Sequence, residues 1–104
     1  MSTATAALGA IRRAIRAGAW QADPHLLKRL TQRRLLLSDV LEALRRAERA
    51  TPHDMRPLNP GGESWRVYGR DSDDRLLGVG VEILRAASGG FVVIITAFVE
   101  ENDS

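Results

Sequence analysis

The spacing of apolar residues changes once along this chain of 104 residues, near residue 60. Before that point, apolar side chains recur every three or four positions, as they do on one face of an amphipathic helix. After it, they alternate with polar side chains, which is the period of a strand with one buried face. The pattern therefore predicts a helical half followed by a half made of strands. A chain of this length forms one core, so residues 1–104 are expected to be a single domain.

The first half carries start and stop signals for three helices. Gly18 follows the first apolar stripe and suits a helix C-terminus, where a left-handed backbone is common. Asp23 is a good N-cap, and Pro24 suits the first helical position because its missing N–H is not needed there. Ser38 is the expected N-cap of the last helix. The helices are expected over residues 4–17, 25–34 and 39–49.

The second half begins with a loop and continues with strands. Residues 51–63 contain three Pro and two Gly, which is loop composition. The alternating stretches predict an antiparallel meander of three strands, and the acidic residues 100–104 are expected to be frayed. The strands are expected over 64–70, 77–83 and 91–99. The predicted fold class is α+β, with N-terminal helices packed on one face of a three- to four-stranded antiparallel sheet.

Charge is distributed unevenly between the two halves. Residues 1–50 hold ten Arg or Lys and four Asp or Glu, whereas residues 51–104 hold five and nine. Fourteen of the fifteen basic residues are Arg. A basic half on a small domain predicts an anionic partner, most plausibly a nucleic acid. The alternative is that the arginines form an ordinary solvated helical surface.

Several classes of protein are excluded by what the sequence lacks. Without cysteine there is no disulfide framework and no thiolate nucleophile. No run of 18 apolar residues could cross a membrane, and the first 20 residues do not resemble a signal peptide, so a cytoplasmic location is expected. P-loop, GxSxG and HExxH motifs are absent. The two histidines lack acidic neighbours at ligand spacing, so neither a metal nor another cofactor is expected.

Two groups of residues could carry chemistry. His25, Arg29 and Arg33 follow one another at intervals of four on the second expected helix, and would place one imidazole and two guanidinium groups on one face. Cleavage of RNA without a metal needs a base, an acid and cations that hold the phosphate. The alternative is an exposed helix face that has no catalytic role.

The second group lies on the first expected strand. If Trp65 and Val67 face the helices, Arg66, Tyr68 and Arg70 share the opposite face, where they could contact phosphates and stack on bases. An ordinary polar sheet face would have the same pattern. Thr96 interrupts the apolar run of the last strand and is, by itself, more plausibly structural.

Short motifs along the chain also match one family. His25, Arg29 and Arg33 reproduce its pattern of a His followed by two Arg at intervals of four, and the next helix, LSDVLEAL at 37–44, has the expected form. The strand motifs of the family are matched by residues 65–68, 75–82 and 92–98. Over about residues 10–99 the chain therefore resembles the bacterial family called domain of unknown function 4258.

That family resembles ribonuclease toxins of the RelE and barnase type and, more distantly, the motility quorum-sensing regulator toxin. The resemblance implies a bacterial RelE-like toxin of a type II toxin–antitoxin pair, which binds and cleaves mRNA and is neutralised by a cognate protein antitoxin. Toxins of the RelE type often carry lysines in the site, whereas this chain has only Lys28, one position off the basic face. Arginines would have to supply the cations, and they are poor proton donors at neutral pH.

Roles can be assigned to individual residues under this hypothesis of a metal-independent endoribonuclease. The expected catalytic residues are His25, Tyr68 and Arg66, of which the first two are the available proton carriers. The expected substrate-binding residues are Arg29, Arg33, Arg70 and Thr96. The alternative is a non-catalytic module that binds RNA or, as an antitoxin or immunity-type partner, a protein. A homo-oligomer is compatible with either hypothesis, and no membrane partner is expected.

Overall fold

The computed structural model describes residues 3–53, 59–86 and 89–100. Its three helices and five strands are arranged as an α+β fold with the sheet order β1-β5-β4-β3-β2. Strand β1 is parallel to β5, and the other neighbouring strands are antiparallel. The elements, in chain order, are α1 (Ala4–Arg16), β1 (Trp20–Ala22), α2 (Pro24–Gln32), α3 (Leu37–Arg45), β2 (Arg49–Pro52), β3 (Glu63–Arg70), β4 (Leu76–Ala86) and β5 (Gly89–Val99).

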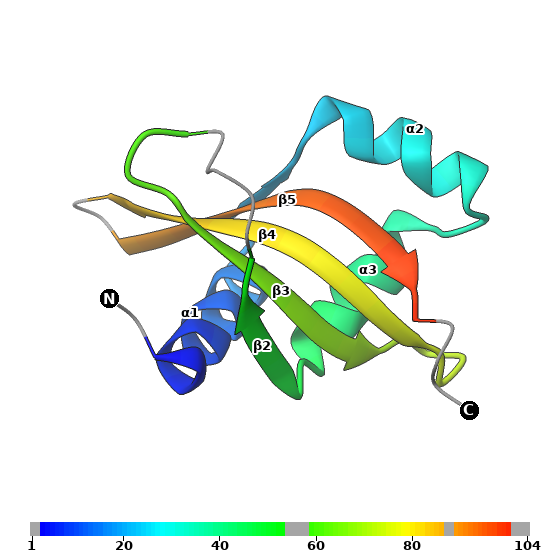
Figure 1. The fold of residues 1–104 in the computed structure, drawn as a ribbon, viewed down its shortest axis with the longest axis horizontal. Coiled ribbons are helices and arrows are strands. Elements are labelled where there is room, and N and C mark those ends of the chain that lie inside the picture. Colours follow the sequence, from blue (N-terminus) through cyan, green and yellow to red (C-terminus); the bar gives the residue numbers. More distant parts are fainter. Residues whose placement is uncertain (1–2, 54–58, 87–88, 101–104) are drawn as a thin grey trace.

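The helices do not surround the sheet evenly. Helices α1 and α3 pack on the same face, whereas α2 lies beside β5 (Figure 1). One core cluster joins the apolar stripes of the helices to alternate residues of the strands. The largest fully buried apolar side chains are Ile11, Leu26, Leu44, Leu77, Ile83 and Ile94. The predicted packing of the N-terminal helices on the sheet is therefore confirmed.

The local signals in the sequence explain where the first two helices begin and end. Thr3 caps α1 through its side chain, and Gly18 follows the helix with a φ of 72°, which an L-residue rarely adopts. Asp23 caps α2 by accepting a hydrogen bond from the backbone N–H of His25, with Pro24 at the first helical position. Both helices were correctly predicted to within about two residues.

The third helix differs from its prediction at both ends. It begins at Leu37 rather than 39, so that Ser38 lies inside the helix and Leu36 is the N-cap residue. The carboxylate of Asp39 reaches back and accepts a hydrogen bond of 2.9 Å from the N–H of Leu36. The helix ends at Arg45 rather than 49, because the chain turns and joins the sheet as β2.

The prediction of an entirely helical first half and an antiparallel sheet of three or four strands was wrong. Strands β1 and β2 also belong to the sheet, which has five strands and is mixed. These strands have three and four residues, too few for a period of two to be recognisable. Pro52 ends β2 at the sheet edge, where its missing N–H is tolerated.

Some predictions fall on residues whose structure is not described. The central part of the expected loop, 54–58, and most of the acidic tail, 101–104, lie outside the described residues. Within the described ranges, no helix is both long enough and apolar enough to cross a membrane.

Candidate active site on the open face of the sheet

Strands β2 to β5 place alternate side chains on the face opposite α1 and α3, which we call the open face. Its side chains include those of Arg49, Thr51, His53, Ser64, Arg66, Tyr68, Arg70, Leu76, Glu82, Leu84, Phe91, Val93, Thr96 and Phe98. Two positions on it are glycines, Gly78 and Gly80 of β4. The open face therefore combines guanidinium groups, one imidazole, one carboxylate, hydroxyls, aliphatic side chains and three aromatic rings on adjacent strands.

The two glycines leave room for side chains from the neighbouring strands. Tyr68 and Phe98 flank Gly78 in the register, and Arg66 and Thr96 flank Gly80. A Cβ at position 78 would lie 2.6 Å from the ring of Phe98, and one at position 80 would lie 2.8 Å from the methyl of Thr96. At these two glycines strand β4 has no side chain on the open face, so side chains from β3 and β5 can lie over its backbone.

The only described histidine on this face, His53, follows directly after β2. Its backbone N–H donates to Ser64, which continues the pairing of β2 with β3 by one residue. Its ring lies over Gly80, with Nε2 3.3 Å from Nη2 of Arg66. The Arg66 guanidinium also lies 5.6 Å from the centre of the Phe98 ring. Arg66 thus connects the imidazole to the aromatic part of the open face.

A shallow hollow that is open to solvent lies between these groups. It is lined by His53, Ser64, Gly80, Val81, Glu82, Ile95 and Thr96. Its enclosed volume of ≈20 Å³ is about that of one water molecule. A ligand would therefore lie across the open face and direct at most one small group, such as a hydroxyl or a phosphate oxygen, into the hollow.

The carboxylate in the hollow belongs to Glu82, which is only 2% exposed. Burying a carboxylate is costly unless hydrogen bonds replace its hydration. Here the backbone N–H of Asn59 donates to Oε1 of Glu82 at 3.1 Å and the Asn59 side chain donates at 3.2 Å. The segment before β3 therefore fixes the position of this carboxylate.

Helix α2 contributes one cation to the rim of the open face. Nη1 of Arg33 donates to Oγ1 of Thr96 at 3.3 Å and to the carbonyl oxygen of Ala97 at 2.6 Å. At the other side of the sheet, the Arg49 guanidinium lies 4.3 Å above the centre of the Tyr68 ring. Arg33 and Thr96, which are 63 positions apart, thus meet beside the hollow.

Three of the cations of this surface, Arg33, Arg49 and Arg66, have no ion pair with a carboxylate among the described residues, whereas Arg70 pairs with Asp74. The contacts of the three are instead with two aromatic rings, an imidazole, a hydroxyl and a carbonyl oxygen. A surface of this kind attracts an anionic ligand, since its positive charges remain uncompensated.

The structure brings together some of the residues that the sequence singled out. Arg33, Arg66, Tyr68 and Thr96 lie on the open face or at its rim. Arg70 shares the face, but its Nη1 donates to the carbonyl oxygen of Asp74 at the end of the sheet. The arrangement joins a helix residue to strand residues, as the hypothesis requires.

His25 and Arg29 lie elsewhere. The side chain of His25 is 83% exposed, and its Nδ1 lies 3.3 Å from Oδ1 of Asp23 at the start of α2. Arg29 is exposed on the same helix. The side-chain hydrogen bond of His25 is with Asp23, not with a described residue of the open face. The imidazole on the open face is that of His53, which the sequence does not single out because this residue falls in a stretch with loop composition. The one signal in the sequence is spacing. His53 is two positions after Thr51 and four positions after Arg49, so all three side chains would lie on one face of an extended segment.

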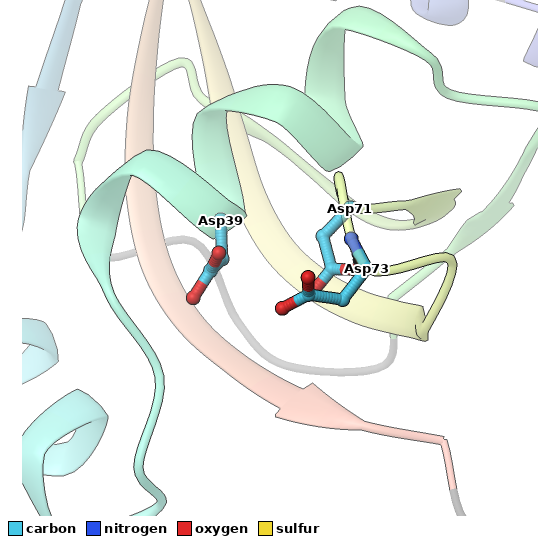
Figure 2. A group of neighbouring side chains, drawn as sticks. All are labelled: Asp39, Asp71 and Asp73. Carbon is cyan, nitrogen blue, oxygen red and sulfur yellow. Dashed lines mark hydrogen bonds between the residues drawn. The ribbon is translucent and has the colours of Figure 1, made fainter.

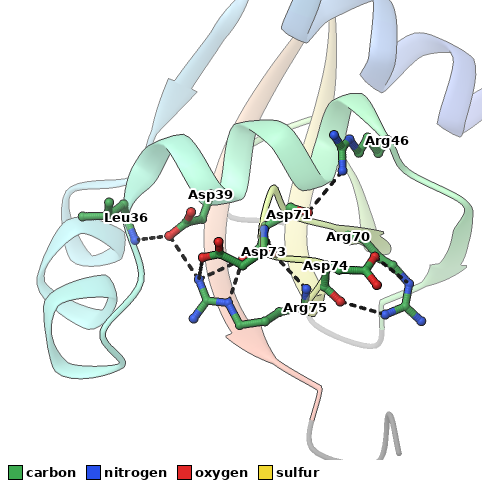
Figure 3. Close-up of polar contacts among 8 residues, drawn as sticks. All are labelled: Leu36, Asp39, Arg46, Arg70, Asp71, Asp73, Asp74 and Arg75. Carbon is green, nitrogen blue, oxygen red and sulfur yellow. Dashed lines mark hydrogen bonds and ion pairs between the residues drawn. The ribbon is translucent and has the colours of Figure 1, made fainter.

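A second group of charged residues lies where the turn between β3 and β4 meets α3. Asp39, Asp71 and Asp73 direct one carboxylate oxygen each toward a common point, with these atoms within 4.8 Å of one another (Figure 2). Arg75 reaches into this group, and its Nη2 lies 2.8 Å from Asp71 and 3.4 Å from Asp39 (Figure 3). The guanidinium thus takes the place that a cation would occupy.

The hydrogen bonds of Asp71 explain why this group is structural. Its side chain is 0% exposed, and Oδ1 accepts from the backbone N–H groups of Asp73 and Arg75. Its Oδ2 accepts from Nε of Arg75 at 2.8 Å, and its carbonyl oxygen accepts from Arg46, the C-cap residue of α3. The group closes the turn and attaches it to α3.

Comparisons with known proteins do not assign the chain to a family. No family model matches it, and no curated protein or solved structure shows significant similarity. The resemblance to domain of unknown function 4258 therefore stays a prediction. The residues of the open face are the remaining indication of function.

Proposed function

We propose that this chain is a metal-independent endoribonuclease that cleaves mRNA, the RelE- or barnase-like toxin of a type II toxin–antitoxin pair. One observation carries the proposal: His53 and Glu82 line one hollow of the open face, and Arg66 lies in hydrogen-bond contact with His53. The proposed catalytic histidine is His53, because it lines the hollow with Glu82, whereas the side chain of His25 is 83% exposed beside Asp23 at the start of α2. A cognate protein antitoxin would have to cover this face.

The groups around the hollow match the requirements of phosphodiester cleavage through the 2′-oxygen. Glu82 would accept the proton of the 2′-hydroxyl, whose oxygen attacks the phosphorus. The bond from phosphorus to the 5′-oxygen breaks, and protonated His53 would supply the proton for that oxygen. The products are a 2′,3′-cyclic phosphate and a 5′-hydroxyl, so no water or metal enters this step.

Arginines would stabilise the charge that develops on the phosphate. A guanidinium presents paired donors that match two phosphate oxygens. A phosphate bound over the hollow would attract Arg66, which otherwise donates to Nε2 of His53, and would leave this nitrogen facing the 5′-oxygen. Arg33, held beside Thr96 at the rim, is the second cation within the same region.

The proposal is tested with purified protein and a single-stranded oligoribonucleotide in excess EDTA. We expect cleaved products that end in a 2′,3′-cyclic phosphate. Glu82→Gln should lower the rate at least 100-fold, whereas Glu48→Gln, a change of an exposed glutamate, should have no effect. Unbroken RNA after long incubation, with and without divalent metals, would contradict the proposal.

The biological part of the proposal needs a test in cells. Expression of the chain should arrest growth, and co-expression of the adjacent open reading frame should relieve the arrest. An RNA-binding module without catalytic activity would instead show salt-sensitive binding and leave the RNA intact. The two experiments together separate a toxin from such a module.

A further inference from the structure

The aromatic side chains of the open face are not used by the cleavage mechanism. Tyr68, Gly78 and Phe98 form one row across β3, β4 and β5. The neighbouring row, two residues along each strand, contains Arg66, Gly80 and Thr96 and borders the hollow. The two rows are therefore roughly 6.6 Å apart, since a strand rises about 3.3 Å per residue. If one nucleotide binds at the hollow, the adjacent nucleotide would lie over the row formed by Tyr68, Gly78 and Phe98.

The ring of Phe98 lies over the backbone of Gly78. Three of its atoms, Cζ, Cε2 and Cε1, lie 2.6, 2.8 and 3.1 Å from the point where a Cβ of residue 78 would be. A ring in this position buries one face against the strand. The side chain is half-buried, so part of the ring is exposed to solvent beside the Arg66 guanidinium. Such a ring can serve as a platform for a planar ligand.

The charges around this row indicate which planar ligand fits. Arg66 lies 5.6 Å from the centre of the Phe98 ring, and Arg49 lies 4.3 Å from that of Tyr68. Neither arginine is paired with a carboxylate in the described parts of the chain. Aromatic rings interleaved with cations match alternating bases and phosphates of a nucleic acid strand.

We infer that the substrate is single-stranded RNA and that the nucleotide next to the scissile phosphate stacks its base on Phe98. The inference rests on the proposed function for the position of the scissile phosphate, but the stacking is tested by binding alone. A duplex is excluded from this site because its bases are stacked on one another and cannot reach the ring.

The test uses a 2′-O-methyl oligonucleotide, which has no 2′-hydroxyl and is not cleaved by this mechanism. Phe98→Leu should raise the Kd of the single strand about tenfold, because leucine keeps apolar volume but loses stacking. Phe98→Trp should retain binding, which also shows that position 98 tolerates substitution. Phe91→Leu is the matched control on the same face, roughly 23 Å away along β5 at about 3.3 Å per residue, and should change Kd less than twofold.

A base deletion in the ligand identifies the contact directly. One abasic site at the critical position should weaken binding to the wild-type protein about tenfold, and should not weaken binding to the Phe98→Leu variant further. Equal affinity for the single strand and its duplex, or an unchanged Kd for Phe98→Leu, would overturn the inference. Binding that depends on Phe98 without any RNA cleavage would support the platform and contradict the nuclease, so the two proposals fail separately.

Discussion

Nη2 of Arg66 lies 3.3 Å from Nε2 of His53, which places a guanidinium donor on the imidazole of the open face. A guanidinium has only donors, so Nε2 of His53 is the acceptor in this hydrogen bond. This hydrogen bond joins β3 to the residue that follows β2, and a bound phosphate could compete for the same guanidinium. Under the proposed function, catalysis would begin when Arg66 exchanges its hydrogen bond with the imidazole for one with the phosphate.

The first prediction distinguishes the two histidines of the chain. His53→Ala should lower the cleavage rate about 100- to 1,000-fold, since it removes a proton carrier. His25→Ala should change the rate less than twofold, because the His25 ring is exposed beside Asp23. The measurement is single-turnover cleavage of an oligoribonucleotide, with unfolding followed for both variants. A reversed result would return the catalytic role to α2.

The second prediction concerns the glycine beneath Phe98. In Gly78→Ala, the new Cβ would be 2.6 Å from the ring, so the ring must move away from the floor of the sheet. We expect weaker binding of single-stranded RNA, by about fivefold, with the cleavage rate at saturating RNA changed less. Gly90→Ala is the control, because no atom lies within 4 Å of its Cβ position. Kd and single-turnover rates measured for both variants separate binding from chemistry.

The third prediction treats the carboxylate group around Arg75 as a structural element. Asp71→Asn leaves the guanidinium beside a buried amide and should lower the free energy of unfolding by about 3 kcal/mol. Asp73→Asn should cost less than about 0.5 kcal/mol, because that carboxylate is 74% exposed and 3.9 Å from Arg75. Urea denaturation measures both values. Stabilisation of the wild type by added divalent cations, lost in Asp71→Asn, would show that this group binds metal.

The parts of the fold that were predicted correctly are those with long periodic patterns or strong caps. Helix α2 has both Asp23 and Pro24 at its start, and the pattern of β3 extends over eight residues. Strand β1 has three residues and exists because β5 supplies its hydrogen-bond partners, so no local signal could reveal it. Tertiary pairing decided these elements rather than local propensity.

The candidate site was only partly predictable for the same reason. Arg66 and Tyr68 were found from alternation within one strand, whose faces are set by Trp65 and Val67. His53 joins them only because β2 pairs with β3 and the pairing continues to Ser64. Glu82 is held by Asn59, a contact that spans 23 positions. These relationships depend on register between segments, which a pattern within one segment does not contain.

The last prediction measures how many charges of the open face contact the RNA. For a single strand, the slope of log Kobs against log salt concentration is about −0.7 per phosphate contact, because binding releases condensed counterions. Arg49→Ala and Arg33→Ala should each reduce the magnitude of this slope by about 0.7, and the double variant by about 1.4. Arg16→Ala, an exposed change near the end of α1, should leave it unchanged. Titrations of the 2′-O-methyl strand between 50 and 300 mM salt, on the order of a sixfold range, resolve these differences. Equal slopes for all variants would mean that RNA binds to another surface of the protein.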